Sequence, residues 1–380
     1  MSDPVVLVVH AVDTEGPLGG DARRLPDGSP EFFDNWEEIR ASLAELTADA
    51  FRSGHADSFG SPYRFNWFVM DFTGFRTNPK CRVAAYHDTW DELNALPTRL
   101  DGLYWHYHVP PESGIGDEWS PSWLTSNEAN IVLSRRLLER GAFPAAYRAG
   151  GTIEDDAASA WLEETIPIDF SNRISERSVP GADLNHFSWY GAPAVWGSYH
   201  PARDDYRREG GMRRFVYRSL DLRSRYYDMT QEIVDACFRE VAASCESRVL
   251  SYFSHDNREM RPETYFVHEL LASAAERTGV PWVSCTAVEA HQRFHGLDPE
   301  PIQLALELET DAVRIQASRE PFQAAPFVAA ELADGRFARL FAKRESALSW
   351  CLPVALGRVR RLGAAVTSDA GVTTVVEEEL

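Results

Sequence analysis

The sequence predicts a mixed α/β protein: a parallel β-sheet or barrel with crossover helices over residues 1–297, followed by a small antiparallel β domain over residues 298–380. Short apolar runs typical of buried strands alternate with amphipathic helical patterns through most of the chain. From about Pro299, apolar residues instead occupy every second position, and Asp334-Gly335 and Asp369-Ala370-Gly371 are typical hairpin turns. The length of 380 residues suits two domains or one barrel with an appendage.

The first strand is expected at residues 5–9, a continuous apolar run of the kind found in buried parallel sheets. Residues 34–51 follow as an amphipathic helix. Two later helices carry end signals: a capping box of Thr125 and Glu128 with a closing Gly141, and a helix from Pro262 to Gly279. Further strands are expected at residues 65–72, 102–109, 145–151, 166–171, 249–253 and 282–286, and further helices at residues 88–96, 155–164 and 230–244.

A long aromatic insert at about residues 172–228 interrupts the alternation of strands and helices, and such segments in compact domains are usually functional. Its residues 203–225 hold eight arginines against four acids, inside a very acidic protein. One interpretation is a solvated surface with internal salt bridges. The other is a clamp for an anionic group on the substrate, because arginine can bind a phosphate or carboxylate through two parallel hydrogen bonds. The clamp would comprise Arg207, Arg208, Arg213 and Arg214.

The overall charge and composition exclude several classes of partner. A formal net charge of −20 argues against nucleic acid or an anionic membrane surface, since both call for a basic footprint. We expect neither a membrane span nor a signal peptide, because no long apolar run and no basic N-terminal region are present. A cytoplasmic protein is therefore expected. The five cysteines form no CxxC pair and are interpreted as reduced core residues.

Two acids, Asp13 and Glu15, lie where the first predicted strand runs out into a loop. Like charges so close together repel unless a cation or a proton lies between them. The acids are therefore either part of a metal-centred hydrolytic site or solvated residues of a loop. His106 and His108 end the third strand and point to the same side of it. Two imidazoles and a carboxylate suit Zn²⁺ or another divalent ion, although histidines so spaced also occur as packing or surface residues.

Three more residues of chemical interest lie at strand ends: Arg148 on the fourth strand, Asp169 on the fifth and His255 on a later one. In parallel barrels the catalytic groups gather at the carboxyl ends of the strands. The shared position of these residues therefore predicts one site rather than several.

Five short motifs follow one another along the chain: Asp13-Thr14-Glu15-Gly16, Trp105-His106-Tyr107-His108-Val109-Pro110, Tyr147-Arg148-Ala149-Gly150-Gly151, Asp169-Phe170-Ser171 and Ser254-His255-Asp256. In this order they resemble the motifs of the NodB-type polysaccharide deacetylases, which are the family-four carbohydrate esterases and their relatives. The resemblance covers roughly residues 5–290 and implies a distorted (β/α) barrel. Its specificity comes from the order and number of the motifs, because each is short.

The resemblance implies a role for each residue of the metal site. Asp13 would be the catalytic base, Glu15 a metal ligand, and the histidines of the second motif the remaining ligands. The family's histidines are commonly four residues apart, whereas here the position four after His106 is Pro110. His106 therefore matches the pattern better than His108.

The other motifs supply the remaining parts of the implied mechanism. Arg148 would hold Asp13 ionised, and a backbone N–H near Gly150 or Gly151 would stabilise the oxyanion. His255 would protonate the leaving amine. Asp169 would orient His255, with Asp256 as the competing residue for that task.

The expected activity is that of a deacetylase or amidohydrolase acting on C–N bonds other than peptide bonds, with Zn²⁺ as the favoured divalent ion. It would remove an N-acyl group, typically acetyl, from an amino sugar, an oligosaccharide or a sugar-containing metabolite. The missing export signal disfavours intact cell-wall polymer and favours a soluble precursor, including an anionic one. Two alternatives stay open: hydrolysis of a non-sugar amide or cyclic ureide on the same fold, and a catalytically silent sugar-binding scaffold. The sequence permits a monomer or a homo-oligomer.

Overall fold

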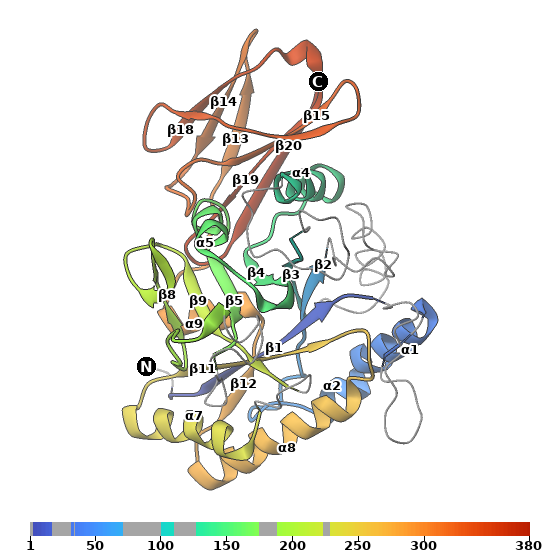
Figure 1. Cartoon of the computed structure of the whole chain (residues 1–380), viewed down its shortest axis with the longest axis vertical. Helices are drawn as coiled ribbons and strands as arrows, with labels where there is room; N and C mark the ends of the chain where they lie inside the picture. The colour runs from blue at the N-terminus through green and yellow to red at the C-terminus, as the bar shows by residue number, and fades with distance from the viewer. Residues whose placement is uncertain are drawn as a thin grey trace.

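The computed structural model describes residues 3–16, 32–33, 35–70, 100–109, 127–174, 188–222 and 229–380. A mixed α/β part is followed by two antiparallel sheets, which lie at the top of Figure 1. The helix predicted at residues 88–96 and the capping residue Thr125 lie outside the described residues.

One large sheet forms the centre of the α/β part, in the order β10-β11-β1-β2-β3-β4-β5-β9-β6, with β12 paired to β1. Its pairings are parallel except for β6 with β9. The strands are β1 (Val6–Thr14), β2 (Asn66–Met70), β3 (Gly102–Tyr107), β4 (Ala146–Ala149), β5 (Ile168–Asn172), β6 (Ser198–Tyr199), β9 (Phe215–Arg218), β10 (Leu220–Asp221), β11 (Arg248–His255) and β12 (Trp282–Ser284).

The sheet curls because two consecutive strands, β9 and β10, pair with strands that lie far apart in the order of the sheet. β9 pairs with β5, β10 pairs with β11, and only Ser219 separates β9 from β10. The Ser219 N–H donates to the Asn172 carbonyl at 2.7 Å, which continues the contact with β5. The mixed α/β fold with a curled, mostly parallel sheet is therefore confirmed, whereas the (β/α) barrel is not. The regular helix after each strand that a full (β/α) barrel requires is not seen in the described part of the chain.

Seven α-helices are described around the sheet: α1 (Trp36–Thr47), α2 (Asp49–Gly54), α4 (Glu128–Arg140), α5 (Asp156–Glu163), α7 (Gln231–Ser244), α8 (Arg261–Thr278) and α9 (Ala287–His295). α1, α7 and α8 pack on one outer face in a shared apolar core, and α4 and α5 lie between the sheet and the C-terminal sheets (Figure 1). In the described residues no helix has the length and apolar character needed to cross a membrane.

Three helix predictions need correction. The single helix predicted at residues 34–51 is two helices, because Ala48 is extended with ψ 141°. α4 begins at Glu128, so Glu128 is not the third helical residue that a capping box requires, although Gly141 closes the helix in the left-handed conformation as predicted. α9 was not predicted, although the capping box of Thr286 and Glu289 at its start is readable in the sequence.

The continuous apolar run of β1 reflects burial on both sides of the sheet. Val6, Val8 and Val12 pack outward against the helices. Leu7 and Val9 pack into the interior of the curled sheet. Because side chains alternate along a strand, Asp13 has the same orientation as Leu7 and Val9 and points into the interior. β1 runs on to Thr14, so Asp13 lies within the strand rather than in a loop after it.

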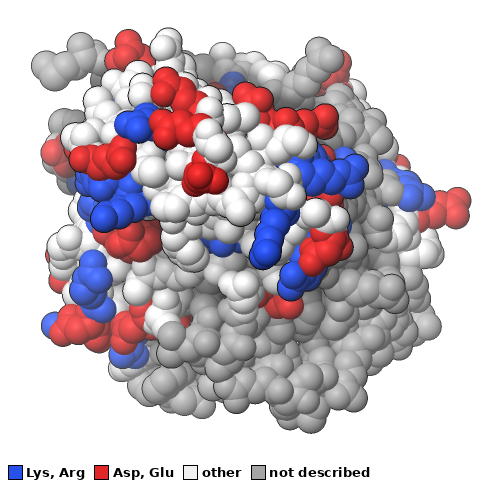
Figure 2. Space-filling model, turned by 90° about the horizontal axis from the view of Figure 1, so that it is seen from above, with Lys and Arg blue, Asp and Glu red and all other residues white. Residues whose placement is uncertain are grey.

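The C-terminal region consists of two four-stranded antiparallel sheets around a common apolar core, which confirms the predicted antiparallel β structure. The predicted turns at Gly335 and Gly371 both join neighbouring antiparallel strands and have positive φ. Figure 2 looks down on this region and shows acidic and basic side chains mixed over the visible face. The strands are β13 (Leu304–Leu308), β14 (Ala312–Ala317), β18 (Ser349–Pro353) and β17 (Lys343–Arg344) in one sheet, and β16 (Phe337–Leu340), β15 (Phe327–Leu332), β19 (Val359–Thr367) and β20 (Thr373–Glu379) in the other.

This region packs directly on α4, where Gly363 of β19 allows a close approach. A Cβ atom at Gly363 would lie 2.3 Å from Leu137 Cδ2, so no larger residue fits there without a shift. Gln323 adds two buried hydrogen bonds, donating to the Thr165 carbonyl and accepting from the Thr367 N–H, both at 2.8 Å.

Candidate metal centre and active site

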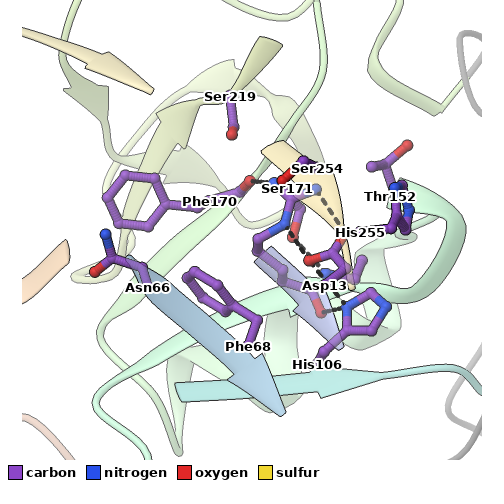
Figure 3. A network of polar contacts seen from close by, with 12 residues as sticks. Asp13, Asn66, Phe68, His106, Thr152, Phe170, Ser171, Ser219, Ser254 and His255 are labelled. Atoms are coloured by element: carbon purple, nitrogen blue, oxygen red, sulfur yellow. Dashed lines mark hydrogen bonds and ion pairs between the residues drawn. The ribbon is translucent and has the colours of Figure 1, made fainter. Parts of the chain in front are cut away.

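The curled sheet brings four of the predicted site residues together from four strands. Asp13 of β1 is the register partner of His255 on β11, and His106 of β3 is the register partner of Arg148 on β4. Figure 3 shows Asp13, His106 and His255 gathered at the ends of their strands. The predicted convergence of these residues is therefore seen in the fold.

Glu15, His106 and His108 form a buried group whose ligand atoms all lie within 4.8 Å of one another. His106 Nε2 lies 3.1 Å from His108 Nε2 and 3.9 Å from Glu15 Oε1, and His108 Nε2 lies 3.5 Å from the same oxygen. Two atoms bound to one zinc ion at about 2.1 Å are at most about 4.2 Å apart, so all three distances fit a shared ion. The group could hold a divalent metal, and its nitrogen and oxygen donors suit zinc without identifying it.

The hydrogen bond of His106 to the backbone directs its Nε2 atom, rather than Nδ1, to a metal. Its Nδ1 lies 3.1 Å from the carbonyl oxygen of Arg148, which only accepts, so Nδ1 carries the proton and Nε2 carries the lone pair. Burial lowers the pKa of His106 to about 4, with Asp13 opposing the shift, so the ring is neutral near pH 7. A metal-ligating histidine has to be neutral, and a hydrogen bond to its second nitrogen fixes the ring orientation.

Asp13 and Arg148 form a buried ion pair through two hydrogen bonds. Arg148 Nε donates to Asp13 Oδ1 at 2.7 Å, and Nη2 donates to Oδ2 at 3.1 Å. Burial would raise the pKa of Asp13, but the charge and hydrogen bonds of Arg148, together with His106 and His255, outweigh burial and lower the pKa to about 2. Arg148 is itself held by the Phe170 carbonyl and by the ring of Phe253, 4.1 Å from its Cζ. Asp13 is therefore ionised and rigidly placed beside His106.

His255 lies beside the same oxygen of Glu15 that the two histidines of the metal group approach. Its Nε2 lies 3.8 Å from Glu15 Oε1. Burial lowers its pKa below the ordinary value, so the ring is neutral near pH 7. In the described part of the chain its Nδ1 has no hydrogen-bond partner.

The prediction that Asp169 orients His255 is wrong. Asp169 is the register partner of Tyr147, so it shares the face of Tyr147 and points away from the side on which Arg148 lies. Its Oδ1 accepts from the Ser171 N–H at 2.7 Å and its Oδ2 from Arg214 at 3.1 Å.

Asp256, the competing residue, binds the backbone instead. Its Oδ1 accepts from the N–H groups of Glu15 at 2.7 Å and Gly16 at 3.0 Å. Asp256 therefore shapes the chain just after β1 and holds Glu15 in place.

Asp221 and Arg173 near His255 were not predicted. Asp221 is the register partner of Phe253 on β11 and is among the charges that raise the pKa of His255 against burial. Its Oδ2 lies 2.5 Å from Arg173 Nη2, and both side chains are buried. An acid between two leucines, Leu220 and Leu222, is the sequence signal that could have singled it out.

Gly150 lies against His108 of the metal group, and Gly151 follows it in the short 3₁₀ helix Gly150–Thr152. A Cβ atom at Gly150 would lie 2.4 Å from His108 Cγ, so only glycine leaves room for that ring. Gly151 and Thr152 both have positive φ, 58° and 57°, which for threonine is an unfavourable conformation. Trp189 of the insert donates to the Thr152 carbonyl at 2.6 Å and helps to hold this turn.

The four arginines of the predicted anion clamp do not converge on the site. Arg207 and Arg208 lie on the strand β8 (Asp205–Glu209), which forms a small hairpin with β7 (Pro201–Ala202). The alternative interpretation, internal salt bridges, agrees with the structure. The pairs are Arg207 with Asp205, Arg208 with Asp204, Arg213 with Glu163, and the fully buried Arg214 with Glu154 and Asp169.

Comparisons with known proteins leave the family of the chain open. No protein-family model matches the sequence, and no curated protein matches it either. The function is therefore argued from the geometry of the site.

Proposed function

We propose that the protein is a metal-dependent hydrolase of the NodB-type deacetylase kind, built on a distorted (β/α) barrel. It would cleave the C–N bond of an N-acyl group, acetyl in the first instance, on an amino sugar or a sugar-containing metabolite. The observation that carries the proposal is the buried group of Glu15, His106 and His108, with the Asp13–Arg148 ion pair and His255 beside it.

The bound divalent ion would polarise the amide carbonyl and lower the pKa of a water molecule. Glu15, His106 and His108 would hold that ion. Asp13, kept ionised by Arg148, would accept a proton from the attacking water. The backbone near Gly150 and Gly151, which packs against His108, would donate to the oxygen that becomes negative.

The pKa values of the two flanking groups suggest how the proton moves. Asp13 has a pKa of about 2 and holds an added proton weakly. His255, its partner on the neighbouring strand, is neutral near pH 7 and so can accept that proton. In the proposed mechanism the proton therefore passes to His255, which delivers it to the leaving amine. The four arginines predicted as a clamp pair with acids of the chain and have no role in the proposed substrate contacts.

A substrate panel tests this function. The zinc-loaded protein is incubated with N-acetylated amino sugars, their oligomers and sugar nucleotides, and with cyclic ureides, and release of acetate or ammonia is measured. We expect acetate release that His255→Gln lowers by about 10²–10⁴-fold, the usual contribution of a general acid. Arg208→Ala, which changes an exposed residue outside the site, serves as the control and keeps full activity.

Each other outcome of the panel assigns a different function. Ammonia release from a ureide without acetate release would favour the non-sugar amidohydrolase. No release from any substrate by protein that holds its metal would contradict the deacetylase. Protein that binds no metal would favour the silent sugar-binding scaffold.

A further inference from the structure

The two residues that follow His255 both bind Glu15, and neither role is part of the proposed mechanism. Asp256 fixes the backbone of Glu15 and Gly16 through its carboxylate. Asn257 binds the side chain: its Nδ2 donates to Glu15 Oε2 at 3.4 Å. The end of β11 therefore holds Glu15 at both its backbone and its carboxylate.

The two oxygens of Glu15 face different partners. Oε1 lies within 4 Å of the Nε2 atoms of His106, His108 and His255. Oε2 receives the hydrogen bond from Asn257, whose side chain is buried with 2% exposed. Because a carboxylate only accepts hydrogen bonds, the amide nitrogen of Asn257 has to face Glu15, and this settles the orientation of the amide.

We infer that Asn257 is a positioning residue that presents Glu15 to the metal through one oxygen only. The hydrogen bond occupies Oε2 and leaves Oε1 directed at the two histidines. Residues that form a hydrogen bond to a metal ligand in this way typically contribute about 10–100-fold to metal affinity or activity. The inference rests on the proposed function, because it requires that Glu15 binds a metal.

A rival role for Asn257 follows from its second amide atom. Asn257 Oδ1 is buried and has no hydrogen-bond partner among the residues that the structure describes. A carbonyl oxygen of this kind could itself bind a cation. The isosteric change Asn257→Asp separates the two roles, because aspartate cannot donate to Glu15 but is the stronger cation ligand.

The test measures zinc affinity by competition with a chromophoric chelator, on metal-free wild type, Asn257→Ala and Asn257→Asp. We expect Asn257→Ala to bind zinc about 10–100-fold more weakly than wild type. Asn257→Asp should also bind zinc more weakly than wild type, because an aspartate carboxylate cannot donate the hydrogen bond to Glu15 Oε2. Wild-type affinity in Asn257→Ala, or tighter binding in Asn257→Asp, would overturn the inference.

One retained hydrogen bond and one control variant separate positioning from general stability. The Phe33 N–H donates to the backbone carbonyl of Asn257 at 2.6 Å, and both substitutions keep that carbonyl. Gln323→Ala removes a buried amide that bridges Thr165 and Thr367 in the contact with the C-terminal sheets. It should lower the midpoint of thermal unfolding of the metal-free protein and leave zinc affinity unchanged.

The outcomes also distinguish this inference from the proposed function. If wild type binds no divalent ion, the proposed function fails and the inference fails with it. If wild type binds zinc and Asn257→Ala binds it equally well, only the inference fails. If Asn257→Ala does not fold, as judged by circular dichroism, the isosteric Asn257→Asp decides the question alone.

Discussion

Replacing Arg148 by methionine is expected to lower kcat by about 10²–10⁴-fold, the range associated with loss of a general base. Asp13 would lose both hydrogen bonds that Arg148 donates to its carboxylate. The burial that already opposes ionisation would then raise the pKa of Asp13, so the group would be protonated over a wider pH range. Acetate release measured from pH 4 to pH 9 checks this.

The pH dependence of turnover should differ between wild type and Arg148→Met. In wild type Asp13 is ionised at every pH above about 2, so it imposes no acid limit on turnover in this range. In Arg148→Met, turnover should fall as the pH is lowered through the new, higher pKa. The carbonyl of Arg148 that accepts from His106 belongs to the backbone and is kept, so metal content should not change. Wild-type kcat at all pH values in the variant would contradict the role given to this ion pair.

Replacing Arg214 by methionine is expected to lower the free energy of unfolding by about 3–5 kcal/mol, the usual cost of removing one partner from a buried ion pair. Arg214 is fully buried between Glu154 and Asp169. Burial already raises the pKa of Glu154 well above its ordinary value, with Asp169 adding to the rise and Arg214 opposing it. Without Arg214 the two acids would be left in the core with no cation between them.

Chemical denaturation of the metal-free proteins measures this loss. Arg208→Met is the matched control, because Arg208 pairs with Asp204 on the surface and exposed pairs contribute about 0–1 kcal/mol. Adding Glu154→Gln and Asp169→Asn to Arg214→Met should recover part of the loss by removing the unpaired charges. A loss below about 1 kcal/mol in Arg214→Met would show that the cluster does not stabilise the fold as described.

The sequence was sufficient to predict the residues that strand ends bring together. Asp13 follows a continuous apolar run, and such a run predicts a strand in the middle of a sheet that is buried on both faces. His106 and Arg148 lie at the ends of neighbouring parallel strands, so their proximity required only the order of the strands. The structure agrees with these predictions because the carboxyl ends of parallel strands meet at one edge of the sheet even when the exact register is unknown.

The failed predictions depended on details that local sequence does not contain. Asp169 was assigned to the site, but a shift of one residue in a strand moves a side chain to the opposite face. Arg214 was assigned to a substrate clamp because the sequence does not reveal its acid partners, which are 60 and 45 residues away. Asn257 was overlooked because its partner, Glu15, is 242 residues away.

Metal content tests the central claim, that Glu15, His106 and His108 bind a catalytic divalent ion. The protein is purified without a metal-binding tag, stripped, exposed to zinc, dialysed and analysed for bound metal. The account predicts about one zinc ion per chain in wild type and in the control His200→Ala, and a loss of both metal and activity in His106→Ala. Stoichiometric metal with full activity in His106→Ala would contradict it.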